Sequence, residues 1–441
     1  MAALARFFRL VEHQTTVRTE MLAGVTTFLA MAYIIFVQPA VLSAAGMDAG
    51  AVLTATCLAS ALATLLMAVL ANYPVAVAPA MGHNFFFAFT VVVAGGTPWP
   101  VALGAVAIAG GVFVLTAGLG LRERVIVAVP ESLKHAITVG IGLLIALVGL
   151  EWSGVVVASP GTLVTIGRLG SAPALLALGT LALTSVLMAR RVPGALLIGM
   201  AASTAAAVGL GLARVDGIVA RPPSLAPTFL RLDVIGALRP GLIDVVCVFF
   251  LLALFDSVGT LIGVAGRIGL VRDGTLPRAR QALLADAIGT VAGAMLGTST
   301  VTAYIESAAG VAAGGRTGLA SVVTAACFLL ALFFHPLVKL IGGGYPTAGG
   351  LVLHPMVAPA LVLVGVLMME SVSKIDWRDL TEGIPAFLAA LVMPLAVSIT
   401  DGIAFGFIAY AVLKMATGRG RELSPLGYVF AGIFLLRYAV L

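Results

Sequence analysis

The sequence predicts an all-α polytopic membrane protein. Of its 441 residues, 61% are hydrophobic and only 10% are charged, and the mean hydropathy is +1.14. A soluble domain carries about 25% charged residues, so this composition excludes a soluble enzyme and a disordered chain. Long apolar runs separated by polar or Gly/Pro-rich breaks follow one another along the chain, without the alternation of a β-barrel.

About fourteen membrane-spanning segments fit, because each needs about 20 apolar residues. A polar, proline-containing stretch from Arg214 to Pro240 separates segments 7 and 8. The apolar tail 424–441 either lies on the membrane or forms a further short helix. The expected segments are 21–43, 50–71, 74–94, 101–121, 134–151, 172–189, 193–213, 242–266, 281–297, 298–314, 318–338, 350–371 and two within 383–417.

The positions of the basic residues indicate how the chain is oriented in the membrane, and they do not indicate a nucleic-acid partner. With the N-terminus in the cytoplasm, most of the 25 Lys and Arg residues fall on the cytoplasmic side, as the positive-inside rule requires. We therefore expect a multi-pass protein of the cytoplasmic membrane with both termini in the cytoplasm. The basic residues are scattered singly, which argues against a nucleic-acid partner. Cys57, Cys247 and Cys327 lack metal-site spacing, and we expect neither a metal nor a cofactor.

Two of the segments carry helix-breaking sequences. Segment 3 begins with Tyr73–Pro79, which holds two prolines, and segment 10 begins with the polar, β-branched Gly297–Tyr304 before a helical-looking Ile305–Ala313. In each, the first half is expected to be extended and the second half helical. Extended backbone at membrane depth must be shielded by protein or line a cavity. The alternative is a pair of kinked helices.

The broken segments are seven apart, so the second one runs in the opposite direction through the membrane. This arrangement is typical of inverted repeats that place a binding site near the midplane, between the two breaks. We expect residues 1–240 to form the first repeat of seven segments and residues 241–441 to form the second. The N-termini of the half-helices then direct partial positive charge at the site.

Three carboxylates lie well inside the predicted segments, where an acidic side chain is costly and marks a functional candidate. Glu306 is the strongest, because it follows the switch from extended chain to helix in segment 10. Asp256 lies within segment 8. Asp286 is weaker, since it could cap a helix or pair with Arg280 at the cytoplasmic face.

The surroundings of Asp256 allow a purely structural interpretation as well. Its side chain could bond to the neighbouring hydroxyls of Ser257 or Thr260. Gly259 and Gly263 are four residues apart, a spacing that favours close helix packing in membranes.

Further candidates for binding a ligand lie in the broken segments themselves. Asn84 follows the break in segment 3, and its carboxamide can both donate and accept hydrogen bonds at the edge of a heterocyclic ring. Phe85 could stack on a ring, although most of the neighbouring phenylalanines are expected to contact lipid or the core. With Thr302, Asp256 and Glu306 these form the expected substrate-binding set. The sequence has no Walker A, G-x-S-x-G or H-E-x-x-H motif, so we do not expect an enzyme.

A set of conspicuous stretches carries a resemblance to a known family. They are 18–37, 71–74, 254–265, 276–286, 297–311, 365–369 and 374–377. On these stretches the chain resembles the adenine/guanine/hypoxanthine permease branch of the nucleobase:cation symporter-2 (xanthine/uracil permease) family.

This resemblance implies a fold and a function. The fold has fourteen segments in two inverted repeats, arranged as a core domain and a gate domain, and the function is proton-coupled purine uptake. The resemblance places the polar residue of segment 3 on Asn84 and the carboxylates of segments 8 and 10 on Asp256 and Glu306. These two carboxylates are then the proton-coupling groups. The implied partners are a purine nucleobase, a proton or sodium ion, the lipid bilayer and a possible second copy of the chain.

The chain also departs from the family pattern. His83 and Phe85 replace the usual Leu and Ala beside the site, which bears on purine selectivity. Gln38 stands where Asn usually precedes Pro, and Ala253 replaces a common acidic residue, which bears on coupling. The stretch Lys339–His354 is longer and richer in Gly than usual, which predicts a changed loop between segments 11 and 12.

Two other classes of protein compete with a purine importer. A sulfate-type anion carrier of the same architecture should have a basic residue at the midplane, whereas the predicted midplane has carboxylates. A membrane-embedded enzyme or a non-transporting binding protein should show a nucleophile–base pair or a metal cluster. We therefore expect a secondary active transporter that imports hypoxanthine, guanine or adenine by proton symport.

Overall fold

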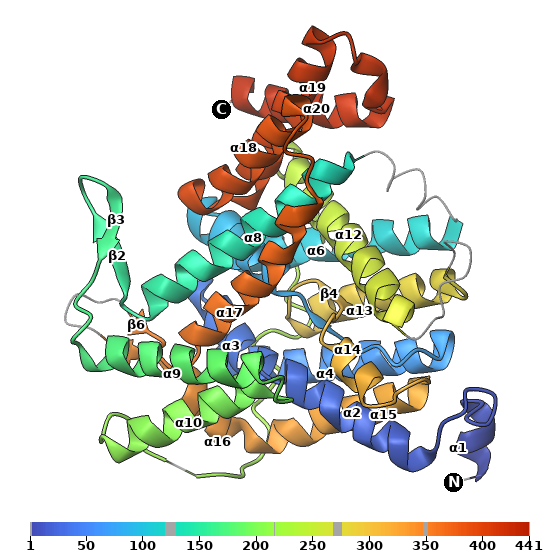
Figure 1. Ribbon diagram of the computed structural model, residues 1–441, viewed down its shortest axis with the longest axis vertical. Coiled ribbons are helices and arrows are strands. Elements are labelled where there is room, and N and C mark those ends of the chain that lie inside the picture. The colour runs from blue at the N-terminus through green and yellow to red at the C-terminus, as the bar shows by residue number, and fades with distance from the viewer. Residues whose placement is uncertain (1, 120–128, 216, 268–275, 347–351, 441) are drawn as a thin grey trace.

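The computed structural model describes residues 2–119, 129–215, 217–267, 276–346 and 352–440 (Figure 1). As expected, the fold is mostly helical. The first half contains α1 (Ala2–Phe7), α2 (Val17–Met31), α3 (Ile34–Ala44), α4 (Ala49–Leu66), the π-helical η1 (Met67–Ala71), β1 (Val77–Pro79), α5 (Met81–Phe85), the π-helical η2 (Phe86–Ala94), α6 (Trp99–Leu119), α8 (Glu131–Trp152), β2 (Val156–Ser159), β3 (Leu163–Ile166), α9 (Ala172–Ala189), α10 (Ala195–Gly209) and α11 (Val234–Ala237).

The second half follows the same pattern of long helices and short extended pieces. It contains η3 (Pro240–Leu242), α12 (Ile243–Arg267), α13 (Ala279–Leu296), β4 (Val301–Ala303), α14 (Ser307–Ala312), α15 (Gly318–Ala331), η4 (Leu332–Phe334), α16 (His335–Gly342), β5 (Tyr345–Pro346), β6 (Val352–Leu353), α17 (Ala358–Met368), η5 (Met369–Lys374), α18 (Leu380–Ala396), α19 (Ile399–Ala416), η6 (Gly420–Glu422) and α20 (Pro425–Val440).

The helices include many that can cross a membrane. Within the described ranges, eight helical stretches are long and apolar enough to span a bilayer, and shorter apolar helices accompany them. Each expected segment coincides with a helix or with a strand followed by a helix. The chain is therefore a multi-pass membrane protein, and the count of fourteen crossings stays a prediction.

The helices pack as two bundles. In the first bundle, α2, α3, α4, α6, α12, α13, α14 and α15 contact one another, and in the second bundle, α8, α9, α10, α17, α18, α19 and α20 do. The bundles meet where α12 and η2 approach α19, where α5 approaches α8 and where α10 approaches α2. Each bundle takes helices from both halves of the chain. The division into repeats at residue 240 also stays a prediction.

The extended stretches predicted in segments 3 and 10 are confirmed, and they pair with each other. β1 and β4 form a two-stranded antiparallel sheet in which Val77 lies opposite Ala303 and Ala78 opposite Thr302. Both strands are fully buried within the first bundle. Each is followed by a helix, α5 or α14, so that both half-helices begin beside this small sheet.

Threonine side chains from neighbouring helices close the outer edges of this sheet. Thr64 of α4 both donates to the Val77 carbonyl and accepts from the Val77 amide, each at 3.0 Å. Thr290 of α13 donates to the Val301 carbonyl at 2.7 Å. These bonds satisfy backbone groups that lipid could not satisfy, which explains how extended chain is tolerated at this depth.

Glycines at helix crossings bring other helices close together. A Cβ on Gly365 of α17 would lie 2.5 Å from the carbonyl oxygen of Gly142 in α8. A Cβ on Gly24 of α2 would lie 2.4 Å from the carbonyl oxygen of Ala320 in α15. Any side chain at these positions would separate the helices, so these glycines have a packing role.

One buried carboxylate has an evident structural role. Glu20 of α2 is fully buried and accepts three backbone N–H groups at the start of α15, from Arg316 (2.9 Å), Thr317 (3.3 Å) and Ala320 (3.2 Å). These are the donors that a helix N-terminus leaves without intrahelical partners. Burial of an acidic side chain therefore does not by itself identify the functional site.

One feature of the loops goes beyond the expectations, and the tail contains the further helix that was one of its two expected forms. A hairpin of β2 and β3, between α8 and α9, extends from the side of the molecule (Figure 1). The tail forms a sixteen-residue helix, α20, which runs antiparallel to α19. Phe407 contacts Phe434 at 6.1 Å between ring centroids, and the Tyr438 hydroxyl donates to Asp401 at 2.6 Å.

Asp379 caps α18 just outside the membrane-spanning part of the chain. Its carboxylate accepts from the hydroxyl (2.7 Å) and amide (2.9 Å) of Thr381 and pairs with Arg419 at 2.6 Å. The Thr381 hydroxyl and the Arg419 guanidinium hold the pKa of Asp379 at about 2, below its ordinary value of 3.8. Because the pKa is lower in the folded state, this stabilisation is present above about pH 4 and is lost as the pH falls towards 2.

A pH series tests this contribution. Asp379→Asn keeps an oxygen that can cap α18 but removes the charge, so we expect a lower thermal midpoint than wild type at neutral pH. The difference should shrink as the pH falls from about 4 towards 2, because the carboxylate is protonated first in the unfolded chain and only near pH 2 in the folded protein. The measurement is the thermal midpoint of both purified proteins across that range. A difference that stays constant with pH would contradict the assignment.

Candidate functional site

Glu306 lies at the position that the sequence predicts, directly before α14. Its side chain is half-buried, and the helix that follows it makes no side-chain cap bond with it. The hydroxyl of Tyr33 donates to Glu306 Oε1 at 2.7 Å. Tyr33 lies in the short interruption between α2 and α3, so a third discontinuous segment contributes to the site. The tyrosine holds one carboxylate oxygen in place.

Asp256 lies on α12, facing β4. The hydroxyl of Thr302, which is fully buried, donates to Asp256 Oδ2 at 3.0 Å. Asp256 itself is exposed although it lies in the middle of a long apolar helix. Asp256 and Glu306 are close enough to interact electrostatically. The structure therefore brings together three of the predicted residues, Asp256, Thr302 and Glu306, next to the paired strands.

Asn84 lies on the buried side of this arrangement. Its Oδ1 accepts a short hydrogen bond from Ser299, and Gln38 of α3 donates to Thr298 at 3.0 Å. Asn84 and Gln38 are fully buried, and the Asn84 amide nitrogen has no partner within the described part of the chain. In this conformation Asn84 therefore fixes the stretch that leads into β4 and is closed off from the exposed face of Asp256.

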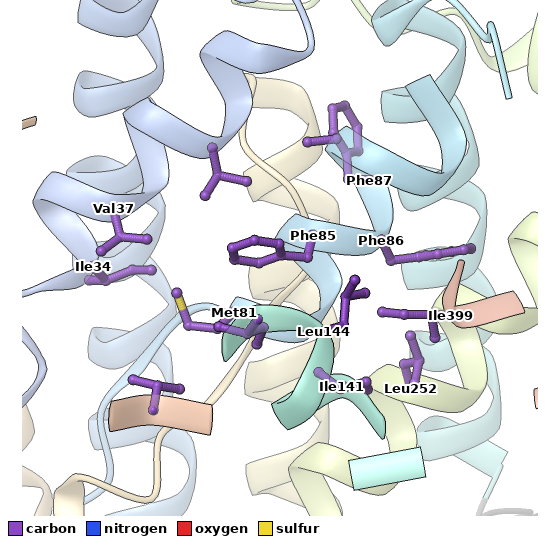
Figure 2. Close-up of a cluster of buried hydrophobic side chains, with 14 of the residues drawn as sticks. Ile34, Val37, Met81, Phe85, Phe86, Phe87, Ile141, Leu144, Leu252 and Ile399 are labelled. Carbon is purple, nitrogen blue, oxygen red and sulfur yellow. The ribbon is translucent and has the colours of Figure 1, made fainter. Parts of the chain in front are cut away.

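Phe85 is part of an apolar cluster between the bundles. Figure 2 shows its ring beside Ile34 and Val37 of α3, with Leu144 of α8 nearby. It is fully buried, and it stacks on Phe89 with ring centroids 5.4 Å apart. The structure does not place Phe85 with Asp256 and Glu306. A role in substrate binding requires the bundles to move apart.

Asp286 is fully buried in α13 and bonds to Ser257 of α12 rather than to a basic side chain at the cytoplasmic face. The Ser257 hydroxyl also contacts the Ala253 carbonyl at 2.6 Å. A hydroxyl carries one hydrogen. That hydrogen is shared between the two acceptors, or Asp286 is protonated and donates to Ser257. A neutral carboxyl group at Asp286 is the prediction tested next.

Paired substitutions test this neutrality. Asp286→Asn supplies an uncharged group that donates and accepts, so we expect its thermal midpoint to stay close to that of wild type. Asp286→Ala removes the partner of Ser257 and should destabilise the protein by about 1–3 kcal/mol. The measurement is thermal unfolding of the purified variants in detergent. If the asparagine variant were as unstable as the alanine variant, Asp286 would be charged in the folded protein.

Gly259 and Gly263 have a spacing that allows close helix packing, but they make no close helix contact with the described residues. Apart from the nearby backbone of α12 itself, no described atom lies within 4 Å of a Cβ built on Gly259. A Cβ on Gly263 would meet only Ile305 Cδ1, at 3.4 Å. The spacing alone could not reveal this, because a four-residue glycine repeat marks one face of a helix without saying what that face meets.

Sequence reasoning missed two residues that complete the site, Tyr33 and Ser299. Tyr33 lies in an apolar run with no proline or glycine to mark the break between α2 and α3. The signal that remained was a hydroxyl in the middle of an otherwise apolar segment. Ser299 lies in the polar stretch that begins segment 10, but nothing in the sequence pairs it with Asn84.

This fold is that of transporter membrane domains. The transmembrane domain of a cyanobacterium bicarbonate transporter, BicA, is similar with a TM-score of 0.63 at 19% identity, over 87% of this chain and 97% of that one. SLC26A9 is similar with a TM-score of 0.64 at 14% identity, over 95% of this chain and 69% of that one. At these identities the likeness concerns the fold alone.

The chain belongs to the Permease family (Xan_ur_permease), whose model matches residues 18–405. It is 50% identical to the putative permease MJ0326 of Methanocaldococcus jannaschii, over 100% of this chain and 99% of that one. It is 46% identical to the adenine permease AdeP of Escherichia coli K12 (98% and 95% covered) and 44% identical to the guanine/hypoxanthine permease PbuO of Bacillus subtilis 168 (98% and 100% covered). The resemblance drawn from the motifs is confirmed.

Proposed function

We propose that this protein imports purine nucleobases across the cytoplasmic membrane by proton symport. Relatives that match almost the whole chain are named for adenine and for guanine/hypoxanthine. The observation that carries the proposal is the pair of carboxylates, Asp256 and Glu306, beside the two paired strands. Each is held by a hydroxyl donor, Thr302 or Tyr33 respectively.

The chemistry of a purine suits this pair of groups. A carboxylate accepts hydrogen bonds, and each purine offers ring N–H donors. Because Tyr33 occupies Oε1 of Glu306, the second oxygen of this carboxylate is the one that accepts from the ring. Asn84 contributes by ordering the approach to β4, and Phe85 supplies an aromatic face once the bundles separate.

The same carboxylates couple transport to protons. A charged carboxyl group is expensive to move through an apolar barrier, and protonation removes much of that cost. In the proposed cycle Asp256 takes up a proton from outside, the site moves between the two faces of the membrane, and the proton leaves with the purine. In this proposal both termini lie in the cytoplasm, and the two inverted repeats meet at residue 240. The second bundle forms the contact between the two copies of a homodimer.

Uptake assays test the function directly. Cells that express the chain should accumulate labelled hypoxanthine, guanine or adenine, and unlabelled purines should compete. Proton coupling predicts that accumulation falls as the outside pH rises and is insensitive to removal of Na⁺. Accumulation that needs Na⁺ at every pH would identify sodium, and not the proton, as the coupling ion. No purine accumulation in cells that contain the protein in the membrane would refute the proposal.

Two alternatives give different results in the same experiment. An anion carrier would show competition by sulfate or bicarbonate and none by purines, but the carboxylates of the candidate site repel anions. A binding protein that does not transport would retain purine affinity without exchange of labelled for unlabelled purine across the membrane. The two paired broken segments favour a transporter over a binding protein. They do not separate a purine importer from an anion carrier of the same architecture, which the competition experiment does.

A further inference from the structure

The segment before α2, residues 2–16, is fixed to one end of the first bundle. Phe8 is buried in a small cluster with Ala68 of η1 and Leu319 of α15. Asn72, which directly follows η1, donates its side-chain amide N–H to the Phe8 carbonyl at 3.1 Å. α1 therefore projects from that end of the bundle with one side against protein (Figure 1).

The other side of this segment carries large apolar side chains that the described protein does not cover. Leu4, Phe7 and Val11 are 49%, 59% and 89% exposed. Leu4 and Phe7 are three residues apart in α1, so they lie on one face of the helix, and Val11 follows in the next turn. One exposed apolar residue is ordinary, but a group of them marks a surface that binds something.

The position of this apolar surface in the fold indicates what covers it. Three helical stretches that can span a bilayer have one end beside the segment, namely Val17–Ala44, Ala49–Ala71 and Gly318–Gly342. The segment therefore lies at the level where the chain enters the membrane. From this level α2 exposes an apolar face to the acyl chains, formed by Met21, Leu22, Val25 and Leu29. The exposed apolar side chains of the segment border the same lipid.

The charges of the segment suit an anionic membrane surface. Arg6 and Arg9 lie among the exposed apolar side chains and are themselves exposed, and Arg18 follows in the first turn of α2. Glu12 is the one acidic residue in the sequence between positions 2 and 19, and it pairs with Arg9 at 3.6 Å. An excess of positive charge remains, and each basic side chain near an anionic leaflet raises the affinity about fivefold.

We propose that α1 and the turn after it form an interfacial anchor, whose apolar side chains enter the membrane surface and whose arginines bind the phosphates of anionic phospholipids. A second copy of the chain is a poorer occupant, because a symmetrical contact brings the same arginines of both copies together. The inference goes beyond the proposed function. It gives the first bundle, which carries Asp256 and Glu306, a lipid partner irrespective of the solute that is transported.

A thiol placed in the anchor tests the membrane contact. Leu4→Cys keeps the other two exposed apolar side chains, and Glu12→Cys places the matched control thiol at an exposed polar position of the same segment. In nanodiscs of phosphatidylglycerol and phosphatidylcholine in equal parts, a charged maleimide should label Leu4→Cys at least about tenfold more slowly than Glu12→Cys. Wild-type protein is the blank for the native thiols in α4, α12 and α15, which are Cys57, Cys247 and Cys327.

Removing the arginines tests the recognition of anionic lipid. Added to Leu4→Cys, Arg6→Gln and Arg9→Gln should each speed the labelling about fivefold in the mixed nanodiscs and change it little in phosphatidylcholine alone. The matched control is Arg190→Gln with Arg191→Gln, which lowers the net charge equally at two exposed residues at the end of α9, in the second bundle. It should leave the labelling rate of Leu4→Cys unchanged.

Three results would overturn the proposal. Equal labelling of Leu4→Cys and Glu12→Cys in the mixed nanodiscs would do so, since both side chains are exposed on the protein alone. Protection of Leu4→Cys that is as strong in phosphatidylcholine alone, or that survives the loss of both arginines, would exclude a role for anionic headgroups. Protection that grows with the number of copies per nanodisc would assign the surface to a second copy. Purine uptake enters none of these measurements, so they stand or fall independently of the proposed function.

Discussion

Replacing Glu306 with glutamine is expected to reduce purine uptake by about 10–100-fold, the largest effect of any single substitution at the site. Glutamine has nearly the same shape and can still accept the Tyr33 hydroxyl bond. It lacks the charge that strengthens a hydrogen bond from a ring N–H, a difference of about 1.5–3 kcal/mol. The measurement is initial uptake of labelled hypoxanthine, guanine and adenine, corrected for the amount of protein in the membrane.

Tyr33→Phe is expected to have a smaller effect on uptake than Glu306→Gln. It removes only the 2.7 Å hydrogen bond to Glu306 and leaves the carboxylate free to rotate. We expect a higher KM with a smaller change in maximal rate, because the carboxylate remains but is no longer held in place. Normal uptake by Glu306→Gln would remove Glu306 from the proposed binding group, whatever the result for Tyr33→Phe.

Asp256→Asn is expected to uncouple transport from protons. The asparagine oxygen can still accept from Thr302, which donates at 3.0 Å in the wild-type protein, so the fold and the site should persist. A carboxamide, however, does not exchange a proton. We therefore expect the variant to lose accumulation of purine against a gradient and to keep exchange of labelled for unlabelled purine.

Proteoliposomes with an imposed pH gradient distinguish these two activities. Wild-type protein should concentrate purine inside when the outside is acidic, whereas the variant should only equilibrate it. Thr302→Val serves as the control, because it removes the hydroxyl donor and keeps the carboxylate at Asp256, so pH-driven accumulation should survive. An Asp256→Asn protein that still accumulates purine in response to the pH gradient would place the coupling proton elsewhere.

Much of the architecture was accessible from the sequence because it depends on local chemistry. Hydropathy located the helices, since each apolar run forms its own backbone hydrogen bonds in lipid. Prolines before Met81 and β-branched residues before Glu306 predicted extended backbone, and β1 and β4 confirm it. The identity of the paired strands could not be predicted in the same way, because Val77 and Ala303 lie far apart in the chain.

Part of the candidate site could also be predicted from the sequence. A carboxylate inside an apolar run stands out in any sequence, so Asp256 and Glu306 could be selected without a structure. Tyr33 could not, because it comes from another segment and hydroxyls are common in membrane helices. Thr302 was expected in the binding set, but its hydrogen bond to Asp256 in a different segment could not be predicted. Glu20 shows the limit of the argument, since its fully buried carboxylate caps α15 instead.

The pairing of β1 with β4 also has a consequence for biosynthesis. When the ribosome has made β1, its partner strand β4 does not yet exist. The backbone groups on the edge of β1 that will face β4 then have no hydrogen-bond partners. The threonine of α4 can protect only the other edge. The early part of the chain must therefore remain in a hydrated or chaperoned environment until β4 emerges. A nascent chain arrested before Val301 should accordingly be a substrate for membrane quality control, and one arrested after α14 should not.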